Sequence, residues 1–247
     1  MQARFEADGD VIVVTGGANG IGRALARAAA QAGARVVVCD VDETAMVALS
    51  DISGILTRRL DVADRAQVFA VLGDVERQFG KIDGLVCAAA IQPRALVHEM
   101  EAAAWERVLR INLDGVVWCY QAVVAGMIAR RRGSIVAFTS GLAHQGWPRA
   151  SAYAASKAAL IAFAKSAAKE IVRHRVRFNL IAPGVIDTPQ YRAANTGADD
   201  AYWRGSVGVG QPQDAVGALM FLLSDAATMT GSLISRDLAY PAQDGEA

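Results

Sequence analysis

The sequence has few cysteines, few histidines and no excess of charge of either sign. Its 247 residues include only Cys39, Cys87 and Cys119, an odd number that excludes a disulfide framework and favours a reducing compartment. Lysine plus arginine and aspartate plus glutamate both total 25, so no general attraction to nucleic acid or to an anionic membrane surface is expected. The three histidines are scattered and the cysteines lack ligand spacing, so no metal site is predicted.

Long apolar segments are also missing. The longest, 116–129, is interrupted by Gln121 and falls short of the ~20 residues of a membrane-spanning helix, so a buried helix is expected. Residues 1–10 carry charges of both signs and lack the profile of a signal peptide, so we expect a cytoplasmic protein. With 53% hydrophobic residues the chain excludes disorder, and its length suits a single domain, 1–247.

Apolar, β-branched runs alternate with alanine-rich helical patterns along the whole chain. Strands are predicted at 11–15, 36–39, 54–60, 82–87, 134–139, 176–181 and 233–235. Helices are predicted at 21–32, 44–49, 65–79, 105–129, 153–172 and 213–223. Strands that are apolar on both faces and separated by helices predict an α/β fold: a doubly wound, parallel, seven-stranded sheet of the Rossmann type, with helices on both faces. The aperiodic stretch 189–210 is predicted to be a substrate lid whose helix content stays open.

A glycine-rich segment, 15–22, follows the first strand and precedes the first helix. Glycines at such a junction allow a tight turn and let a pyrophosphate approach main-chain N–H groups at the helix N-terminus. An ordinary strand-to-helix turn is the alternative. The residues predicted to bind a dinucleotide here are Gly16, Asn19, Gly20, Ile21 and Gly22.

The second predicted strand ends next to Asp40, where an acidic side chain receives the ribose hydroxyls of the adenosine half of a dinucleotide. An anion there repels a 2′-phosphate, and neither Asn19 nor Val41 supplies a compensating cation. NAD is therefore favoured over NADP. A solvated turn residue is the alternative reading of Asp40.

Tyr153 and Lys157 are four residues apart in a helical pattern, and Ser140 follows a predicted strand. This spacing puts the first two side chains on one helix face, where the lysine would favour the phenolate of a tyrosine by roughly 1 to 3 pKa units. Tyr153 then becomes a candidate for proton transfer. Taken as an isolated pair, the two residues would be a helix-start aromatic and a solvated lysine.

The pair is not isolated, because the glycine-rich segment, Asp40, Asn112, Ser140 and the Tyr-x-x-x-Lys spacing occur in the order found in the short-chain dehydrogenase/reductase family, which this chain resembles from about residue 10 to residue 237. The resemblance implies an NAD-dependent oxidoreductase that interconverts a secondary alcohol and a ketone. It implies that Tyr153 is the acid/base, that Lys157 lowers the tyrosine pKa and binds the nicotinamide ribose, and that Ser140 polarises the substrate oxygen.

The same resemblance implies further roles along the cofactor. Asn112 resembles the asparagine that holds a water in a proton relay, although a helix-interior asparagine that bonds to local backbone is the alternative. The expected adenine contacts are Asp61 and Val62, and the expected nicotinamide contacts are Pro183, Gly184, Ile186 and Thr188. Ala88 and Ala89 are expected to lie along the cofactor.

Two segments depart from the family pattern. Cys87-Ala88-Ala89-Ala90 stands where the family has Asn-Asn-Ala-Gly, which puts cofactor affinity or sheet stability in doubt. Asp237-Leu238-Ala239 replaces the usual Asp-Gly-Gly near the carboxyl terminus. Family members are commonly homotetramers, so an oligomer is expected, with a tetramer favoured over a dimer.

The substrate is less defined than the reaction. Specificity is expected in segments 92–94, 143–149 and the lid, whose aromatic and cationic residues suit a hydroxylated or carboxylate-bearing compound, or form a solvent rim or subunit contact. A small polyol or sugar-like compound is slightly favoured over a β-ketoacyl thioester. A catalytically silent NAD-binding sensor or structural protein is the alternative from another functional class.

Overall fold

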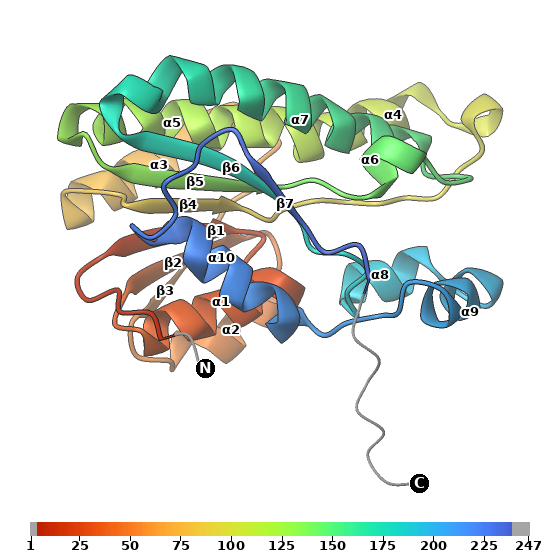
Figure 1. Cartoon of the computed structure of the whole chain (residues 1–247), viewed down its shortest axis with the longest axis horizontal. Coiled ribbons are helices and arrows are strands. Elements are labelled where there is room, and N and C mark those ends of the chain that lie inside the picture. The colour runs from red at the N-terminus through yellow and green to blue at the C-terminus, as the bar shows by residue number, and fades with distance from the viewer. Residues whose placement is uncertain (1–3, 239–247) are drawn as a thin grey trace, which may run out of the picture.

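A computed structural model describes residues 4–238, and these form one sheet with a layer of helices on each face (Figure 1). All seven strands are parallel, in the order β3-β2-β1-β4-β5-β6-β7. The predicted doubly wound sheet is therefore confirmed. The strands are β1 (Val11–Thr15), β2 (Arg35–Asp40), β3 (Ile55–Arg59), β4 (Gly84–Cys87), β5 (Gly133–Phe138), β6 (Val176–Ala182) and β7 (Leu233–Ser235).

The helices divide between the two faces of the sheet (Figure 1). One face is covered by α1 (Gly20–Gln31), α2 (Glu43–Ser50) and α10 (Val216–Leu223). The other is covered by α3 (Arg65–Phe79), α5 (Gly115–Arg130) and α7 (Ser151–Ile171). Because β1, β4 and β5 are buried over their whole length, apolar residues of these strands contribute to the core on both faces.

The predicted helix 105–129 is interrupted by a turn of π-helix. Helix α4 (Ala102–Leu109) leads into the π-helical turn Arg110–Asp114, which continues into α5. The combined segment Ala102–Arg130 includes an 18-residue stretch with a mean hydropathy of 1.3, and it is long and apolar enough to cross a membrane by length and composition alone. Its α5 part, however, packs Val116, Cys119 and Val123 into the core, as expected for a core helix of a folded domain.

The predicted lid contains two short helices. Helices α8 (Pro189–Ala194) and α9 (Ala198–Gly205) lie beyond the carboxyl ends of the strands, on the right of Figure 1. A third short helix, α6 (Leu142–Gln145), precedes α7 in the same region. In the altered carboxyl-terminal segment, Asp237 and Leu238 are described, whereas Ala239 lies outside the described residues.

The turn after β1 passes unusually close to the end of β4. Gly16 has a left-handed backbone (φ +66°), and a Cβ atom built on it would lie 2.4 Å from the backbone nitrogen of Ala89. Gly80, which ends α3, has a similar φ of +76°, but no atom lies within 4 Å of its Cβ position. Both positions disfavour side chains for conformational reasons, but only Gly16 also lacks space.

This difference predicts the outcome of replacing each glycine by alanine. Gly80→Ala should lower the free energy of unfolding by about 1 to 2 kcal/mol, the cost of a left-handed alanine. Gly16→Ala should cost about 1 to 3 kcal/mol more, because the added methyl meets backbone rather than a flexible side chain. Urea unfolding of the two variants measures the difference, and equal losses would show that the two chain segments separate easily.

Candidate active site

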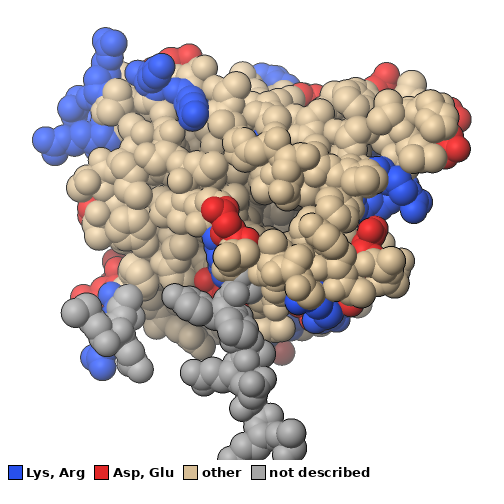
Figure 2. All heavy atoms as spheres, turned by 45° about the vertical axis from the view of Figure 1, so that its right-hand side comes forward, with Lys and Arg blue, Asp and Glu red and all other residues tan. Residues whose placement is uncertain are grey.

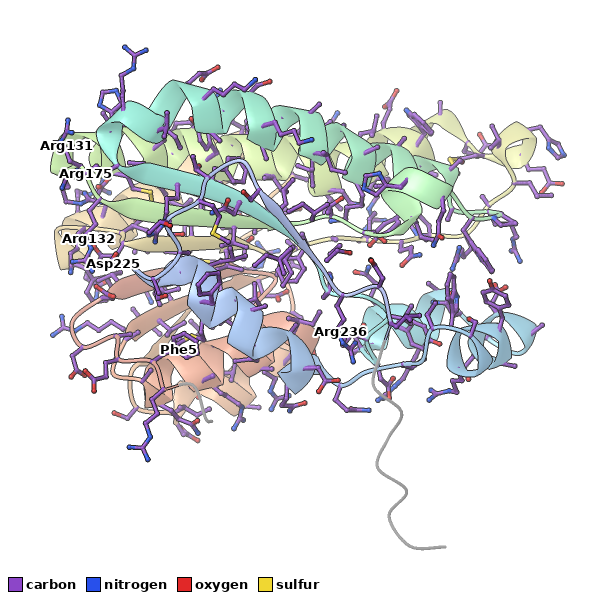
Figure 3. All side chains as sticks on the ribbon, in the orientation of Figure 1. Phe5, Arg131, Arg132, Arg175, Asp225 and Arg236 are labelled. Atoms are coloured by element: carbon purple, nitrogen blue, oxygen red, sulfur yellow. The ribbon has the colours of Figure 1, made fainter. Side chains whose placement is uncertain are left out.

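A large cleft lies at the carboxyl ends of the strands and a small hollow at their amino ends. The small hollow, lined in part by Phe5, Arg132 and Asp225, has a volume of about 60 Å³. Figure 3 shows these residues at the opposite end of the sheet from Arg236, which lies beside α8 and lines the cleft. The cleft has a volume of about 870 Å³. Because ligands of open α/β sheets bind beyond the carboxyl ends of the strands, the cleft is the candidate active site.

The structure brings nearly all of the predicted site residues to this cleft, from segments spread over most of the chain. The predicted site residues that line the cleft are Gly16, Asn19, Gly20, Ile21, Gly22, Asp40, Asp61, Ala88, Ala89, Ser140, Tyr153, Lys157, Pro183, Gly184, Ile186 and Thr188. Two predicted residues, Val62 and Asn112, do not line it. The cleft is thus continuous from the predicted adenosine end to the predicted catalytic residues.

The side chain of Val62 does not line the cleft, and the predicted contact of this residue with adenine stays a prediction. Its side chain is buried, and it occupies the space beside Gly115 at the start of α5. A Cβ atom on Gly115 would lie 2.9 Å from the Val62 side chain, so this contact holds the turn after β3 against α5. The sequence resemblance could not distinguish this packing role from a position facing the cleft.

Asn112 lies under the cleft, fully buried in the π-helical turn. Its Oδ1 accepts a hydrogen bond from the Ile91 backbone N–H (2.8 Å), and its Nδ2 donates to the Ile91 carbonyl (2.9 Å) and to the Ser156 hydroxyl (3.2 Å). The side chain therefore ties the chain after β4 to α5 and α7. Both polar atoms of the side chain form these hydrogen bonds. A relay water would therefore bind to the main-chain carbonyl of Asn112 rather than to its side chain.

Tyr153 and Lys157 lie one turn apart on α7, as the sequence spacing predicts. The Lys157 Nζ atom is 5.6 Å from the centre of the Tyr153 ring. Burial raises the pKa of Tyr153, whereas a hydrogen bond with Ser140 and the charge of Arg94 act in the opposite direction. The pKa of Tyr153 is thus raised rather than lowered, and Arg94, not Lys157, is the cation that opposes the shift. A tyrosine in this state is protonated at neutral pH and suited to donate a proton.

Lys157 is itself buried, with 3% of its surface exposed. Its Nζ donates a hydrogen bond to the Phe138 carbonyl at the end of β5 (2.9 Å). Burial lowers its pKa to about 8, and Cys87 acts weakly in the opposite direction. No carboxylate forms an ion pair with Lys157 in the described part of the chain. The ammonium group is held at the floor of the cleft, where its charge is compensated mainly by backbone dipoles.

At the other end of the cleft, Asp40 terminates β2 as predicted. Its Oδ2 accepts a hydrogen bond from the Ala18 N–H (3.0 Å), and its Oδ1 accepts from the N–H groups of Val41 (2.8 Å) and Asp42 (3.1 Å). These bonds hold the carboxylate beside the glycine-rich turn. The neighbouring Asn19 side chain donates to Asp42 (3.0 Å) rather than to Asp40.

The turn between β1 and α1 fits a dinucleotide. Helix α1 starts at Gly20, has no acidic residue in its first turn, and directs its amino end into the cleft. A Cβ atom on Gly20 would lie 2.9 Å from the Thr188 side chain, so the glycine keeps this passage open. Thr188 accepts a hydrogen bond from the Tyr191 N–H (3.1 Å) and thereby caps α8, which leaves its hydroxyl hydrogen free to face a ligand.

The segment that departs from the family pattern is accommodated without a polar side chain. Cys87 is buried in β4, and a hydrogen bond with Cys87, followed by burial, raises the pKa of the Cys119 thiol of α5. The Ala88 N–H donates to the Thr15 carbonyl (2.9 Å), which maintains the pairing of β4 with β1. Ala90 lines the cleft. At position 87, a thiol in the core takes the place of the amide that the resemblance leads one to expect.

The lid is packed against the loop before α7. Trp147 lies 4.5 Å from Trp203 and 5.0 Å from Tyr202, measured between ring centres. The Trp203 Nε1 donates to the Asn195 Oδ1 (3.2 Å). Figure 2 shows an acidic group at the edge of the central hollow and the largest gathering of lysine and arginine near the upper left corner, away from the hollow. Aromatic packing therefore contributes to holding the lid against this loop.

Arg94 is a residue of the cleft that the prediction of individual site residues omitted, although its segment was expected to contribute to specificity. It follows β4 and donates to the Ala194 carbonyl from Nε (3.0 Å) and to Asn195 Oδ1 from Nη2 (2.5 Å). Its charge reaches Tyr153, as the tyrosine pKa indicates. Its position after the carboxyl end of a central strand was the feature of the sequence that could have identified Arg94 as a site residue.

Comparison with known proteins gives a consistent result. The family described as short chain dehydrogenase matches residues 10–199. Cis-4-hydroxycyclohexanecarboxylate dehydrogenase of Sinomonas cyclohexanicum is 38% identical over 94% of this chain and 96% of its own. A 3-oxoacyl-[acyl-carrier-protein] reductase of Thermotoga maritima is 36% identical (93% and 97%). Galactitol 2-dehydrogenase of Agrobacterium fabrum is 37% identical (87% and 90%).

A solved structure shares the whole fold. The crystal structure of a short-chain type dehydrogenase/reductase from Mycobacterium marinum superimposes with a TM-score of 0.87 and 31% sequence identity. The match covers 94% of this chain and 96% of that chain.

The buried ammonium of Lys157 predicts a specific pH dependence of stability. Its folded-state pKa of about 8 lies below the ordinary value of 10.5, so between these pH values the unfolded chain binds a proton that the folded chain does not. Stability from this group therefore rises with pH across that window. The unfolding free energy of Lys157→Met minus that of the unmodified protein should fall by up to about 3 kcal/mol between pH 7 and pH 10.

The measurement is denaturant unfolding of both proteins at several pH values. Lys165→Met, on the exposed side of the same helix, controls for the loss of a positive charge. A constant difference between Lys157→Met and the unmodified protein across the window would mean that Lys157 is not desolvated.

Proposed function

The chain belongs to the short-chain dehydrogenase family, and on that basis we propose that it is an NAD(H)-dependent oxidoreductase that interconverts a secondary alcohol and a ketone. The observation that carries the proposal is the meeting of Ser140, Tyr153 and Lys157 in one cleft. Ser140 lies close enough to Tyr153 to oppose the rise in its pKa, and Lys157 lies one helical turn further along α7.

In the proposed reaction the phenol of Tyr153 exchanges a proton with the substrate oxygen. Bound NAD(H) supplies or accepts the hydride. Ser140, which lines the cleft beside Tyr153, donates to the same substrate oxygen and orients its carbon toward the cofactor side of the cleft. In ketone reduction the protonated Tyr153 is the donor, which agrees with its raised pKa.

Lys157 and Asn112 act around this proton transfer. The Lys157 ammonium is proposed to bind the ribose next to the nicotinamide and to stabilise the phenolate of Tyr153 after proton loss. Because the Asn112 side chain is hydrogen-bonded to Ile91 and Ser156, we assign the relay water to its main-chain carbonyl. The π-helical turn supports this assignment, since it displaces carbonyl groups from the regular helical hydrogen-bond pattern.

The remaining contacts of NAD follow the length of the cleft. The pyrophosphate is assigned to the glycine-rich turn and the start of α1, and the ribose hydroxyls of the adenosine half to Asp40. Asp61 and Val62 are assigned to the adenine, Val62 through its main chain because its side chain is buried. The nicotinamide is assigned to Pro183, Gly184, Ile186 and Thr188, with Ala88 and Ala89 along the adjoining wall. The common placement of these residues around one cleft supports the assignment.

The sequence and the relatives support two candidate substrate classes. The galactitol dehydrogenase relative supports a small polyol or sugar-like compound, and the acyl-carrier-protein reductase relative supports a β-ketoacyl thioester. A thioester on a carrier protein favours a basic surface around the opening. The main cluster of basic side chains in Figure 2 lies away from the hollow, which favours the small alcohol instead.

We also propose that the chain assembles into a homotetramer through helices α5 and α7. The buried side of α7 packs on the sheet, whereas Ala155 and Ala162 lie exposed on its other side. Small residues in such a row let a second helix approach closely. Trp118 of α5 and Phe163 of α7 are only partly buried and provide apolar area beside that row.

The cytoplasm is the compartment that we propose for this protein. Its three cysteines are free and buried. Burial raises the pKa of Cys39 to about 12, so that thiol stays protonated and unreactive. Unpaired thiols are compatible with a reducing environment.

Replacement of the catalytic phenol tests the reaction. Tyr153→Phe should lower kcat for oxidation of secondary alcohols by about 100-fold or more, because the acid/base is lost, while NADH binding persists. Tyr120→Phe is the matched control, since it removes a phenol hydroxyl from the core outside the cleft. The assay follows NADH at 340 nm over a panel of alcohols and ketones, including polyols.

Two outcomes would contradict this proposal in different ways. Undiminished activity of Tyr153→Phe would remove Tyr153 from the mechanism. Tight NADH binding without turnover on the whole panel would instead favour a catalytically silent NAD-binding protein.

The charge of Asp40 predicts the cofactor preference. We expect kcat/KM for NADH to exceed that for NADPH by about tenfold or more, or ~1.4 kcal/mol, because the carboxylate repels a 2′-phosphate. Asp40→Asn should reduce that ratio, whereas Asp42→Asn, which neutralises an adjacent exposed carboxylate, should change it little. Comparable constants for the two cofactors in the unmodified enzyme would refute the NAD assignment.

A further inference from the structure

We propose that the substrate carries a carboxylate group and that the guanidinium of Arg94 binds it. This proposal rests on the alcohol–ketone function above and specifies the substrate as a hydroxy acid, or its keto acid, with the carboxylate at a distance from the reacting carbon. Four features of the cleft support it: the position of Arg94, its unpaired charge, its free N–H groups and the apolar wall beside it.

Arg94 lies at the substrate end of the cleft rather than along the cofactor. It lines the cleft together with Tyr153, Leu142 and Trp203. These three residues belong to one hydrophobic cluster, which contains neither the glycine-rich turn nor Asp40. The charge of Arg94 opposes the rise in the pKa of Tyr153, and Tyr153 in turn opposes the fall in the pKa of Arg94. A group bound to Arg94 would therefore belong to the same molecule whose oxygen meets Tyr153.

The charge of Arg94 has no anionic partner within the described residues. Its three hydrogen bonds go to neutral oxygens: the carbonyls of Ala194 (3.0 Å) and Pro148 (3.4 Å), and the amide of Asn195 (2.5 Å). Burial lowers its pKa, and the more distant Asp199 only partly offsets this effect. A partly buried charge that is not paired is costly, and an anionic ligand would relieve that cost.

The other arginines of the lid differ in this respect. Arg192 forms an ion pair with Asp187 (2.7 Å), and Arg204 forms one with Asp200 (2.9 Å). Both are exposed, so their charges are also solvated. The lid region therefore neutralises its exposed arginines and leaves the half-buried Arg94 in the cleft without a carboxylate.

Arg94 also keeps hydrogen-bonding capacity for a ligand. A guanidinium has five N–H groups in a planar fork, and three are used by the bonds described above. The two that remain equal the number that a carboxylate accepts in a bidentate contact. Because the existing bonds fix the orientation of the guanidinium, little side-chain entropy would be lost on binding.

The wall between Arg94 and Tyr153 is apolar. Leu142, Trp203 and Val207 line the cleft and belong to the same hydrophobic cluster as Tyr153. Such a wall suits a hydrocarbon ring or chain. Arg94 is thus the group that would recognise the polar end of the substrate.

A purely structural role for Arg94 is the competing explanation, because its bonds to Ala194 and Asn195 hold the lid to the chain after β4. The two explanations predict different ratios of activity on charged and neutral substrates. Loss of a structural tie lowers activity on charged and neutral substrates alike, whereas loss of a carboxylate site lowers activity on the charged substrate selectively.

The experiment uses cyclic and linear hydroxy acids, each paired with its neutral carboxamide of nearly identical shape. In the unmodified enzyme, kcat/KM for the best acid should exceed that for its amide by about 30-fold or more, the discrimination typical of a partly buried charge pair. Arg94→Gln should reduce this ratio about tenfold or more, and Arg94→Lys should restore part of it. Arg173→Gln, which removes an exposed arginine outside the cleft lining, should leave the ratio unchanged.

A binding measurement separates this proposal from the proposed function. Calorimetric titration of cyclohexanecarboxylate, which has no hydroxyl to oxidise, into the enzyme–NADH complex should give binding that Arg94→Gln abolishes and that cyclohexanecarboxamide does not reproduce. Oxidation of neutral alcohols with no advantage for the acids, and no carboxylate binding, would overturn the Arg94 site and leave the alcohol–ketone function intact. Carboxylate binding through Arg94 without any turnover would support the site and refute the function.

Discussion

The adjacency of β1 and β4 is the constraint on which the rest of the molecule depends. The chain runs outward from β1 to β2 and β3 and then returns to place β4 on the other side of β1. At this switch point the turns after the two strands diverge to opposite faces, so the cleft opens between them. Gly16 allows their backbones to meet directly, and α1 and the chain that carries Arg94 depart from that contact.

The zero net charge of the chain conceals an ordered distribution of charge along the cleft. The anion at one end is the carboxylate of Asp40, which accepts hydrogen bonds from three backbone N–H groups. The cations toward the other end are the side chains of Lys157 and Arg94, and burial lowers the pKa of each. Since neither cation is paired with a carboxylate in the described chain, both are available to ligands. The proposed cofactor and substrate would therefore complete the electrostatics of the fold.

Sequence reasoning succeeded where one local cause decides the structure. Strands such as β1 follow from continuous β-branched runs, and the end of α3 follows from Gly80. It failed where two causes compete. The segment 105–129 has a single helical pattern, yet the contacts of Asn112 with Ile91 and Ser156 coincide with a π-helical turn within it. Val62 follows Asp61 in the motif, but packing against Gly115 turns its side chain away from the cleft.

By itself the sequence determined the fold class, the family and the residue types at the reacting centre, because periodicity and motif spacing are local properties of the chain. Only the tertiary structure decided which charges are compensated. Lys157 and Arg94 resemble ordinary cations in the sequence, and their pKa values change because strands, helix and lid exclude water around them. The same folding placed Arg94 near Tyr153, 59 positions later in the chain. Burial depends on contacts between distant segments, and no local pattern records it.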